Sequence, residues 1–180
     1  MRIIAGTAGG ARIDAPPGRD TRPTLDRVRE NLFNMLQGEI PGSRVLDLFA
    51  GSGALSLEAL SRGAALAVMV DHDRQAVQVE KRNIQRLQME DRTRVLQMDW
   101  RQAVRLLAGE DSFDLVFLDP PYEMKDLRDV FSALEPLLAP EGLILLEHEA
   151  KAEIAVCDSF EAVRRRSWGY CGVTFFARRG

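Results

Sequence analysis

Residues 45–53 read Val-Leu-Asp-Leu-Phe-Ala-Gly-Ser-Gly, an apolar run that ends in a turn with two glycines. Apolar residues at helical spacing follow at 55–62, so the stretch predicts a strand, a tight turn and a helix. Glycines in such a turn let a ligand approach the backbone, and the helix offers free N–H groups to it. Ser56 stands where the dinucleotide-binding fingerprint needs its third glycine, and no Gly-Lys-Ser/Thr phosphate loop is present.

Strand and helix patterns alternate through most of the chain. Apolar runs at 44–49, 66–70, 94–98, 114–118 and 143–147 predict strands, and helical patterns occupy 55–62, 75–87, 100–107 and 127–138. Strands that are apolar on both sides predict a mostly parallel sheet with helices on both faces, a Rossmann-like α/β fold. Residues 160–168 and 172–178 predict two more strands joined by a tight Gly-Tyr-Cys-Gly connection, so at least one of them runs antiparallel.

The first 38 residues have a different pattern, and we expect them to form an extension of a sheet domain at 39–180. Short apolar pieces at 3–5 and 12–15 predict a hairpin. Residues 24–36 have the spacing of an amphipathic helix with Thr24 as its N-cap.

Composition limits the class of protein. The chain has 180 residues, 46% of them hydrophobic, which supports a single buried core and excludes a disordered chain. Cys157 and Cys171 have no metal-ligand spacing around them, so we expect reduced thiols and no metal site. No signal-peptide core and no membrane-spanning stretch is present, and no surplus apolar surface is indicated, so we expect a cytoplasmic monomer without a membrane partner.

The net charge of −3 hides an uneven placement of arginine. Of the 24 basic residues 21 are arginines, with six in residues 1–30 and five in residues 161–180. A GC-rich genome would explain the ratio of arginine to lysine, but it would not explain this placement. Arginine forks onto phosphate and stacks on bases. The two ends therefore predict nucleic-acid contacts, made by Arg12, Arg22, Arg164, Arg165 and Arg166.

The acid in the first strand indicates the charge of the ligand. A carboxylate at Asp47, just before the glycine turn, repels a pyrophosphate and attracts an ammonium group. This favours S-adenosylmethionine over a dinucleotide. We expect its methionine end at Asp47 and at the turn formed by Phe49, Ala50, Gly51, Ser52 and Gly53. The alternative is a tight turn in which Asp47 only caps backbone amides.

Acids after the next two strands fit the rest of this cofactor. Asp71 lies 18 residues after Gly53, a spacing typical of a carboxylate that accepts the ribose hydroxyls. His72, beside Asp71, is placed at the same site without a catalytic role. Asp99 can accept from the adenine amino group, and Trp100 or Phe49 can pack on the purine, although ordinary core is an equal alternative for Trp100.

A second motif, Asp119-Pro120-Pro121-Tyr122, follows the buried strand at 114–118. Two prolines stiffen the loop. It would hold the Asp119 carboxylate and the Pro120 carbonyl as two fixed acceptors, with Tyr122 as a flat face beside them. An exocyclic amino group on a base has two N–H donors and a π-face to match. The motif therefore predicts methylation of a planar amine in one in-line step, with orientation as the main catalytic device.

Together these motifs resemble the class I adenosylmethionine-dependent amino-methyltransferases. The flanking sequences resemble the RsmD-type bacterial 16S rRNA guanine-N(2) methyltransferases. They are Arg22-Pro23-Thr24, Asp26-Arg27-Val28-Arg29-Glu30, Leu32-Phe33, the run from Leu57 to Ala64, and Tyr170-Cys171-Gly172-Val173-Thr174. The resemblance implies a class I methyltransferase fold and methylation of the 2-amino group of one guanine in small-subunit rRNA. It also implies that Arg22, Thr24 and Arg27 order over the cofactor and the RNA.

One departure from the family concerns the first hairpin, which is usually rich in arginine. Residues 6–12 keep the glycines but have only Arg12 as a charge, which puts the hairpin's share of RNA binding in doubt. Two other functions stay open. One is methylation of DNA adenine or cytosine, of another RNA or of a protein amide, and the other is RNA binding without catalysis. A chain this short has little surface for reading sequence, so we expect the 16S rRNA substrate within an assembled or partly assembled small ribosomal subunit.

Overall fold

The computed structural model describes residues 1–17, 23–109 and 112–180, with the backbone alone for residues 23–25. Its strands are β1 Arg44–Asp47, β2 Leu66–Asp71, β3 Thr93–Gln97, β4 Phe113–Leu118, β5 Leu138–Glu149, β6 Phe160–Trp168 and β7 Cys171–Arg178. Its helices are α1 Pro23–Met35, α2 Ala54–Ser61, α3 Arg74–Arg86, α4 Trp100–Leu107 and α5 Arg128–Leu134, with 3-10 turns at Glu90–Arg92 and Glu135–Leu137.

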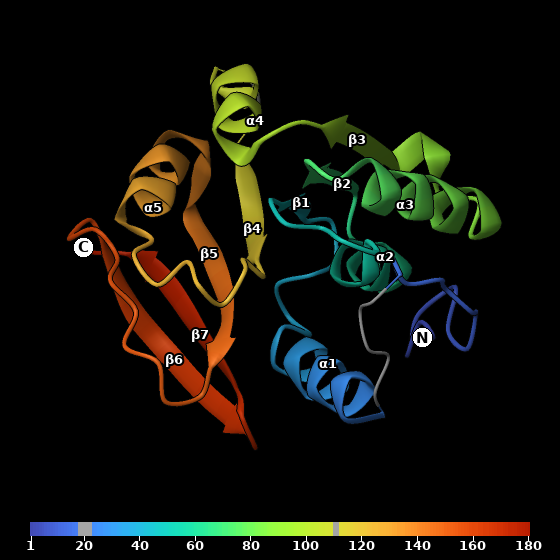
Figure 1. The fold of residues 1–180 in the computed structure, drawn as a ribbon, viewed down its shortest axis with the longest axis horizontal. Helices are drawn as coiled ribbons and strands as arrows, with labels where there is room; N and C mark the ends of the chain where they lie inside the picture. The colour runs from blue at the N-terminus through green and yellow to red at the C-terminus, as the bar shows by residue number, and fades with distance from the viewer. Residues whose placement is uncertain (18–22, 110–111) are drawn as a thin grey trace.

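Within the described residues the strands form one seven-stranded sheet in the order β3-β2-β1-β4-β5-β7-β6 (Figure 1). Neighbouring strands from β3 to β5 are parallel, whereas β7 is antiparallel to both β5 and β6. The predicted class I methyltransferase fold is confirmed, and so is its antiparallel C-terminal edge.

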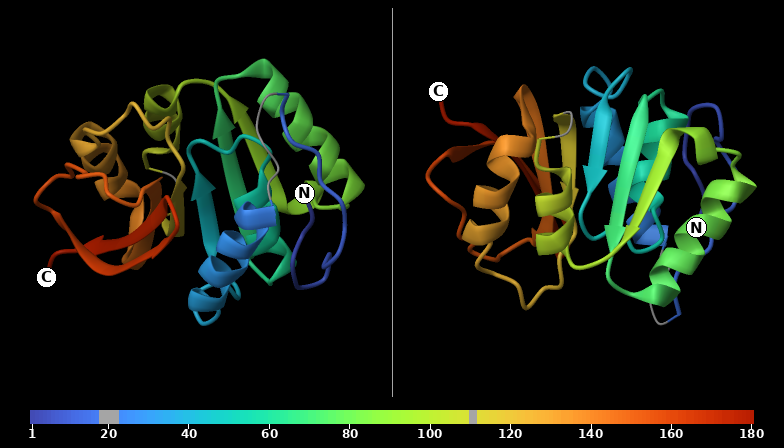
Figure 2. Two further views of the ribbon diagram at one scale, coloured as in Figure 1. Left: turned by 60° about the horizontal axis from the view of Figure 1, so that its bottom comes forward. Right: turned by 90° about the horizontal axis from the view of Figure 1, so that it is seen from above.

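Helices cover both faces of the sheet (Figures 1 and 2). The α1 face, as we call it, packs against α1, α2 and the end of α3 in one apolar core. The α4 face packs against α4 and α5 in a second core. Successive side chains of a strand point to opposite faces, so Leu115 and Phe117 enter the first core while Val116 and Leu118 enter the second. Among the described helices none is long and apolar enough to cross a membrane.

Several predicted boundaries are wrong for local reasons. The first helix begins at Pro23, whose fixed φ suits the first helical position, so Thr24 lies inside the helix and is not its N-cap. The helix predicted at 127–138 ends at Leu134 because Pro136 lacks an N–H, and the chain continues as a 3-10 turn into β5. β1 stops at Asp47, where the glycine turn begins. β6 and β7 leave only Gly169 and Tyr170 between them.

Residues 1–17, which we call the N-terminal arm, run along the α1 face. The hairpin predicted from residues 3–5 and 12–15 is reduced to one antiparallel bridge, between Arg2 and Arg12. Ile3 and Ile13 of the arm are buried in the same core as α1 and α2. The extension and the sheet domain therefore share one apolar core along this face.

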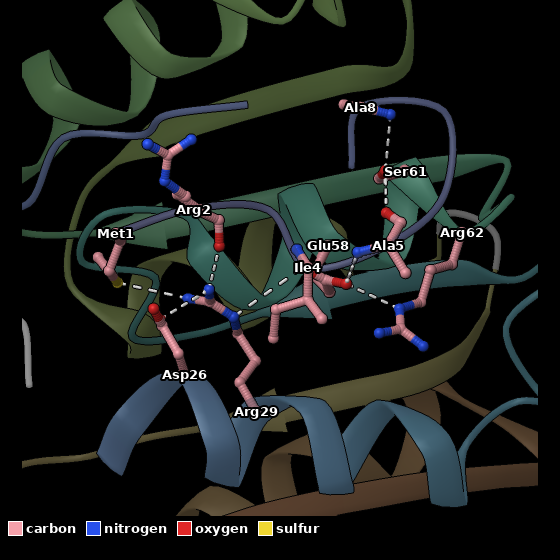
Figure 3. A network of polar contacts seen from close by, with 10 residues as sticks. All are labelled: Met1, Arg2, Ile4, Ala5, Ala8, Asp26, Arg29, Glu58, Ser61 and Arg62. Atoms are coloured by element: carbon pink, nitrogen blue, oxygen red, sulfur yellow. Dashed lines mark hydrogen bonds and ion pairs between the residues drawn. The ribbon is translucent and has the colours of Figure 1, made fainter. Parts of the chain in front are cut away.

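Glu58 of α2 holds the arm in place (Figure 3). Its side chain is fully buried, and its carboxylate accepts the backbone N–H groups of Ile4 at 2.8 Å and Ala5 at 3.1 Å. The Nε of Arg62 donates to the same carboxylate at 2.7 Å. A side-chain acceptor thus takes the role that a partner strand would have for this part of the arm.

Arg29 of α1 joins the same network from the other side (Figure 3). Its Nε lies 3.9 Å from Oε2 of Glu58, and its Nη2 donates to Asp26 at 3.1 Å and to the carbonyl of Arg2. Its Nη1 contacts the sulfur of Met1 at 3.4 Å. Arg29 is buried, so this guanidinium fixes the first residues of the arm relative to α1.

The arm also approaches α2 very closely at Gly6. A Cβ on this residue would lie 1.9 Å from the carbonyl oxygen of Ser61, and its φ is +82°. Both facts require glycine. The N–H of Thr7 donates to the same carbonyl at 2.8 Å.

Replacing Glu58 by alanine should cost about 3 kcal/mol of stability, because Arg29 and two backbone N–H groups lose their buried acceptor. Urea denaturation measures this cost. The control is Glu30→Ala, an exposed acid on α1, which should change stability by about 0.5 kcal/mol or less. Equal stability of the two variants would contradict the anchoring role.

Candidate active site

The end of β4 and the neighbouring part of β5 place two acids side by side. Leu118 lies opposite Leu146 in these parallel strands, and Asp119 and Glu147 are the next residues of each. Leu118 and Leu146 point into the core of the α4 face. Because side chains alternate along a strand, Asp119 and Glu147 project toward the α1 face.

β1 and β2 add two more acids to the same edge and face. Asp47 lies opposite Met69 of β2 and Phe117 of β4, both of which belong to the core of the α1 face. Asp71 lies two residues after Met69 and so shares its direction. Asp47 is buried, and its Oδ2 accepts from the Oγ of Ser56 at 3.0 Å.

The glycine turn is fixed from two sides. Gly53 adopts a left-handed φ of +77° at the start of α2. The N–H of Gly51 donates to Oδ2 of Asp71 at 2.9 Å, and Nδ2 of the buried Asn83 donates to the carbonyl of Ser52 at 2.9 Å. Asp71, predicted as a ribose acceptor, thus also holds the turn in shape.

A cavity on the α1 face joins this turn to the end of β4. It is lined by the predicted residues Asp47, Phe49, Ala50, Ser52 and Asp119, and by Met1, Ala15, Pro16, Val28, Arg29, Leu32, Ala54, Leu55 and Glu147. The arm and α1 supply six of these residues. The N-terminal extension therefore forms part of the cavity wall.

The Asp119-Pro120-Pro121-Tyr122 loop continues from this cavity. Pro120, Pro121 and Tyr122 line an adjoining hollow together with Glu147, which borders both spaces. The N–H of Met124 donates to the carbonyl of Pro121 at 2.9 Å, so the loop closes as a turn. Burial, and then the charge of Glu147, raises the pKa of Tyr122 to about 12. Its hydroxyl stays protonated at neutral pH.

Gly51, Gly53 and Asp71, also predicted at the cofactor site, are not among the residues that line the cavity. His72, Asp99 and Trp100 do not line it either. His72 is exposed, with its Nδ1 3.8 Å from Asp71. Asp99 caps α4, where its carboxylate accepts the N–H of Arg101 at 2.8 Å. Trp100 is buried in the core of the α4 face, as ordinary core would be.

Near the start of α1, the arginine that lines the cavity is Arg29, which was not among the predicted site residues. Arg22 lies outside the described residues, and for Thr24 only the backbone is described. Arg27 is exposed and does not line the cavity. Arg29 is buried and does line it. The sequence contained a signal for this, because Arg29 precedes Leu32 by three residues and Phe33 by four and so lies on the apolar stripe of the helix.

Glu147 and Asn83 were also missed. Glu147 closes the strand predicted at 143–147, as Asp47 and Asp71 close theirs, so the same rule would have found it. No local sequence pattern indicated Asn83, because its role depends on contacts with residues that are distant in the sequence. Its Oδ1 accepts the N–H of Asp14 in the arm at 2.8 Å, while its Nδ2 holds the glycine turn.

The arginines predicted to bind nucleic acid differ in their surroundings. Arg12, Arg165 and Arg166 are exposed. Arg164 instead donates to the carbonyl of Met35 at 3.0 Å, and its guanidinium lies 5.1 Å from the centre of the Phe175 ring. Arg164 therefore binds β6 to α1, which leaves Arg166 as the exposed charge on the same face.

Glu80 of α3 is a buried acid behind the glycine turn. It is fully buried, and within the described ranges neither of its carboxyl oxygens has a hydrogen-bond partner. Burial, and then the charges of Asp47 and Asp71, raises its pKa to about 8. The glycine turn thus has three acids close to it, and at neutral pH the one behind it, Glu80, is uncharged.

Glu80 should make stability fall as pH rises. The folded chain keeps this proton up to about pH 8, whereas the unfolded chain loses it near the ordinary pKa of 4.5. Between these values unfolding releases a proton, so alkalinity favours the unfolded state by roughly a few kcal/mol. In Glu80→Gln this part of the slope should vanish in urea unfolding at pH 5 and pH 8. The exposed Glu90→Gln serves as control, and an unchanged slope in Glu80→Gln would refute the assignment.

Comparison with known proteins agrees with this arrangement. The family model described as Conserved hypothetical protein 95 matches residues 1–177. YlbH of Bacillus subtilis (strain 168) is 36% identical over 184 residues, covering all of both chains. Ribosomal RNA small subunit methyltransferase D of Escherichia coli (strain K12) is 40% identical over 154 residues, which cover 84% of this chain and 76% of that one.

A solved structure of yhhF from Escherichia coli superimposes on this fold with a TM-score of 0.84 and 35% identity, covering 99% of this chain and 97% of that one. The match therefore includes the N-terminal arm and the β6–β7 edge as well as the parallel strands. The chain belongs to the Conserved hypothetical protein 95 family, the family of the RsmD-type methyltransferases that its motifs resemble.

Proposed function

We propose that this chain transfers a methyl group from S-adenosylmethionine to the exocyclic 2-amino group of a guanine in 16S rRNA. One observation carries the proposal, which is that the Asp119-Pro120-Pro121-Tyr122 loop opens directly beside a cavity walled by the glycine turn and Asp47. The printed name of the Escherichia coli relative, a small-subunit rRNA methyltransferase, supports the choice of substrate.

The residues at the cavity fit this cofactor. Asp47 can pair with the ammonium of its methionine end, and Asp71 adds a second carboxylate beside the turn, whereas Glu80 stays uncharged at neutral pH. Phe49 offers an apolar wall, and the predicted contacts of Asp71 with ribose and Asp99 with adenine belong to the same proposal. When bound, S-adenosylmethionine supplies an electrophilic methyl group on a sulfonium.

The loop prepares the amine for transfer. The lone pair of an exocyclic amino group is conjugated with its ring and is a poor nucleophile. The Asp119 carboxylate and the Pro120 carbonyl can accept its two N–H bonds, which localises the lone pair on nitrogen. Tyr122 adds a flat ring and no base, since its hydroxyl stays protonated.

Arginines of β6 lie beside this site. Arg166 pairs in register with Val173 of β7, which in turn lies opposite Glu147 of β5. Residues directly opposite one another share a face, so Arg166 lies on the α1 face, two strands from Glu147. We infer that it binds phosphates of the RNA next to the target base. We further infer that RNA shape or a partly assembled small subunit supplies most of the sequence specificity.

The direct test is methyl transfer from labelled S-adenosylmethionine to naked 16S rRNA, protein-bound small subunits and duplex DNA, with the product mapped by mass spectrometry. We expect N(2)-methylguanine at one position of 16S rRNA. A methylated adenine or cytosine in DNA, or no transfer to any of the three, would overturn the proposal.

Asp119→Ala should abolish methyl transfer while leaving cofactor affinity within about threefold, since the loop binds the amine and not the cofactor. Labelled-methyl transfer and calorimetry give the two values. The exposed neighbour Glu123→Ala is the control and should retain normal turnover. Near-normal turnover in Asp119→Ala would remove the carboxylate from the mechanism.

Arg166→Ala should weaken RNA binding and reduce the slope of log K against log salt by about one, as for the loss of one phosphate contact. Filter binding at several salt concentrations measures the slope. Arg164→Ala is the matched comparison on the same strand. It should mainly lower thermal stability, because that guanidinium binds Met35 and covers Phe175. Equal slopes for wild type and Arg166→Ala would contradict the contact.

A further inference from the structure

Glu147 is a polar residue of the site that has no role in the proposed methyl transfer. Its side chain lies next to Asp119 at the end of the neighbouring strand, and it borders both the cavity and the hollow beneath the proline loop. It is only partly exposed. An acid in this position, beside another acid, is costly unless a donor meets it.

The carboxylate of Glu147 is held by a neighbouring strand. The Sγ of Cys171, in β7, donates to its Oε1 at 3.4 Å. Cys171 is buried, and its pKa is raised by burial and by Glu147, so the thiol remains a donor at neutral pH. Only one oxygen of Glu147 is engaged in this contact, and the other can accept a hydrogen bond from a ligand.

Guanine presents the complementary donors on a single edge. Its 2-amino group carries two N–H bonds, and the adjacent N1 carries a third. If Asp119 and Pro120 accept from the amino group, then N1–H projects to one side of them, where an acceptor is needed. Adenine and 2-aminopurine have a bare lone pair at N1, which a carboxylate repels.

We propose that Glu147 is the specificity-determining residue that accepts the N1–H of the target guanine, so that two carboxylates on adjacent strands read one base edge. The inference rests on the proposed function and adds the means by which guanine is selected. Glu147 takes no part in the bond changes. Its removal should therefore alter the choice between bases more than it alters chemistry on a base lacking N1–H.

The test replaces the mapped target guanine by 2-aminopurine, through ligation of a synthetic RNA segment into 16S rRNA. 2-Aminopurine keeps the reacting 2-amino group but has no N1–H. We expect wild type to prefer guanine by about 10- to 100-fold in kcat/KM. In Glu147→Gln the preference should fall by about tenfold, because an amide can accept from N1–H or donate to a bare N1.

Two other variants keep the outcome clear. Glu153→Gln makes the same change of charge at an exposed position outside both the cavity and the hollow, and should keep the wild-type preference. Glu147→Asp keeps the carboxylate, so it should lower the rate on guanine while retaining the preference. A preference is a ratio within one variant, so partial loss of folding cancels from it.

The possible failures are distinguishable. If wild type does not methylate the unmodified rRNA, the proposed function fails. If wild type methylates guanine and Glu147→Gln keeps the full preference over 2-aminopurine, the role of Glu147 is wrong and the proposed function stands.

Discussion

In-register pairing of parallel strands is the constraint from which the site follows. Adjacent strands lie about 4.8 Å apart, so residues at corresponding positions of the register near this edge of the sheet are neighbours. Side-chain alternation then decides the face. Asp47, Asp119 and Glu147 share both edge and face because the apolar residues before them are fixed in two separate cores. A shift of one residue in any of these strands would turn its acid to the α4 face.

Placing several acids close together destabilises the folded state through charge repulsion. Protonation and hydrogen bonds reduce this repulsion. Glu80 avoids a further charge by retaining its proton, as its raised pKa indicates. Asp71 accepts the N–H of Gly51, and Asp47 accepts from Ser56. Glu58, another fully buried acid, is instead matched by Arg62 and by backbone N–H groups. The acid that anchors the arm is paired with a cation, whereas Asp47 and Asp71 accept from neutral donors of the turn and of α2.

Local pattern predicted the strands and the residues that end them, because burial and turn chemistry act over a few residues. It therefore singled out Asp47, Asp71 and Asp119 as candidate site residues, and the same rule covers Glu147. The pattern could not find Asn83, which acts through contacts with Ser52 and Asp14 far from it in sequence. The resemblance to the family implied a cofactor contact at Arg27, whereas packing places Arg29 in the cavity wall. Helix ends were misjudged where a proline competes with the periodic pattern, as at Pro23 and Pro136.

The position of β7 has a consequence for how the chain assembles. β7 lies between β5 and β6 in the sheet although it comes after both in the sequence. β5 precedes β7 in the sequence, so until β7 is added the edge of β5 that faces away from β4 has no partner strand. β6 does not cover this edge, because it pairs with β7 and not with β5. The open edge of β5 is then a template for pairing with another chain, until residues 171–178 insert and cover it. The same pairing brings Cys171 to Glu147, so one strand both covers this edge of the sheet and completes a wall of the site.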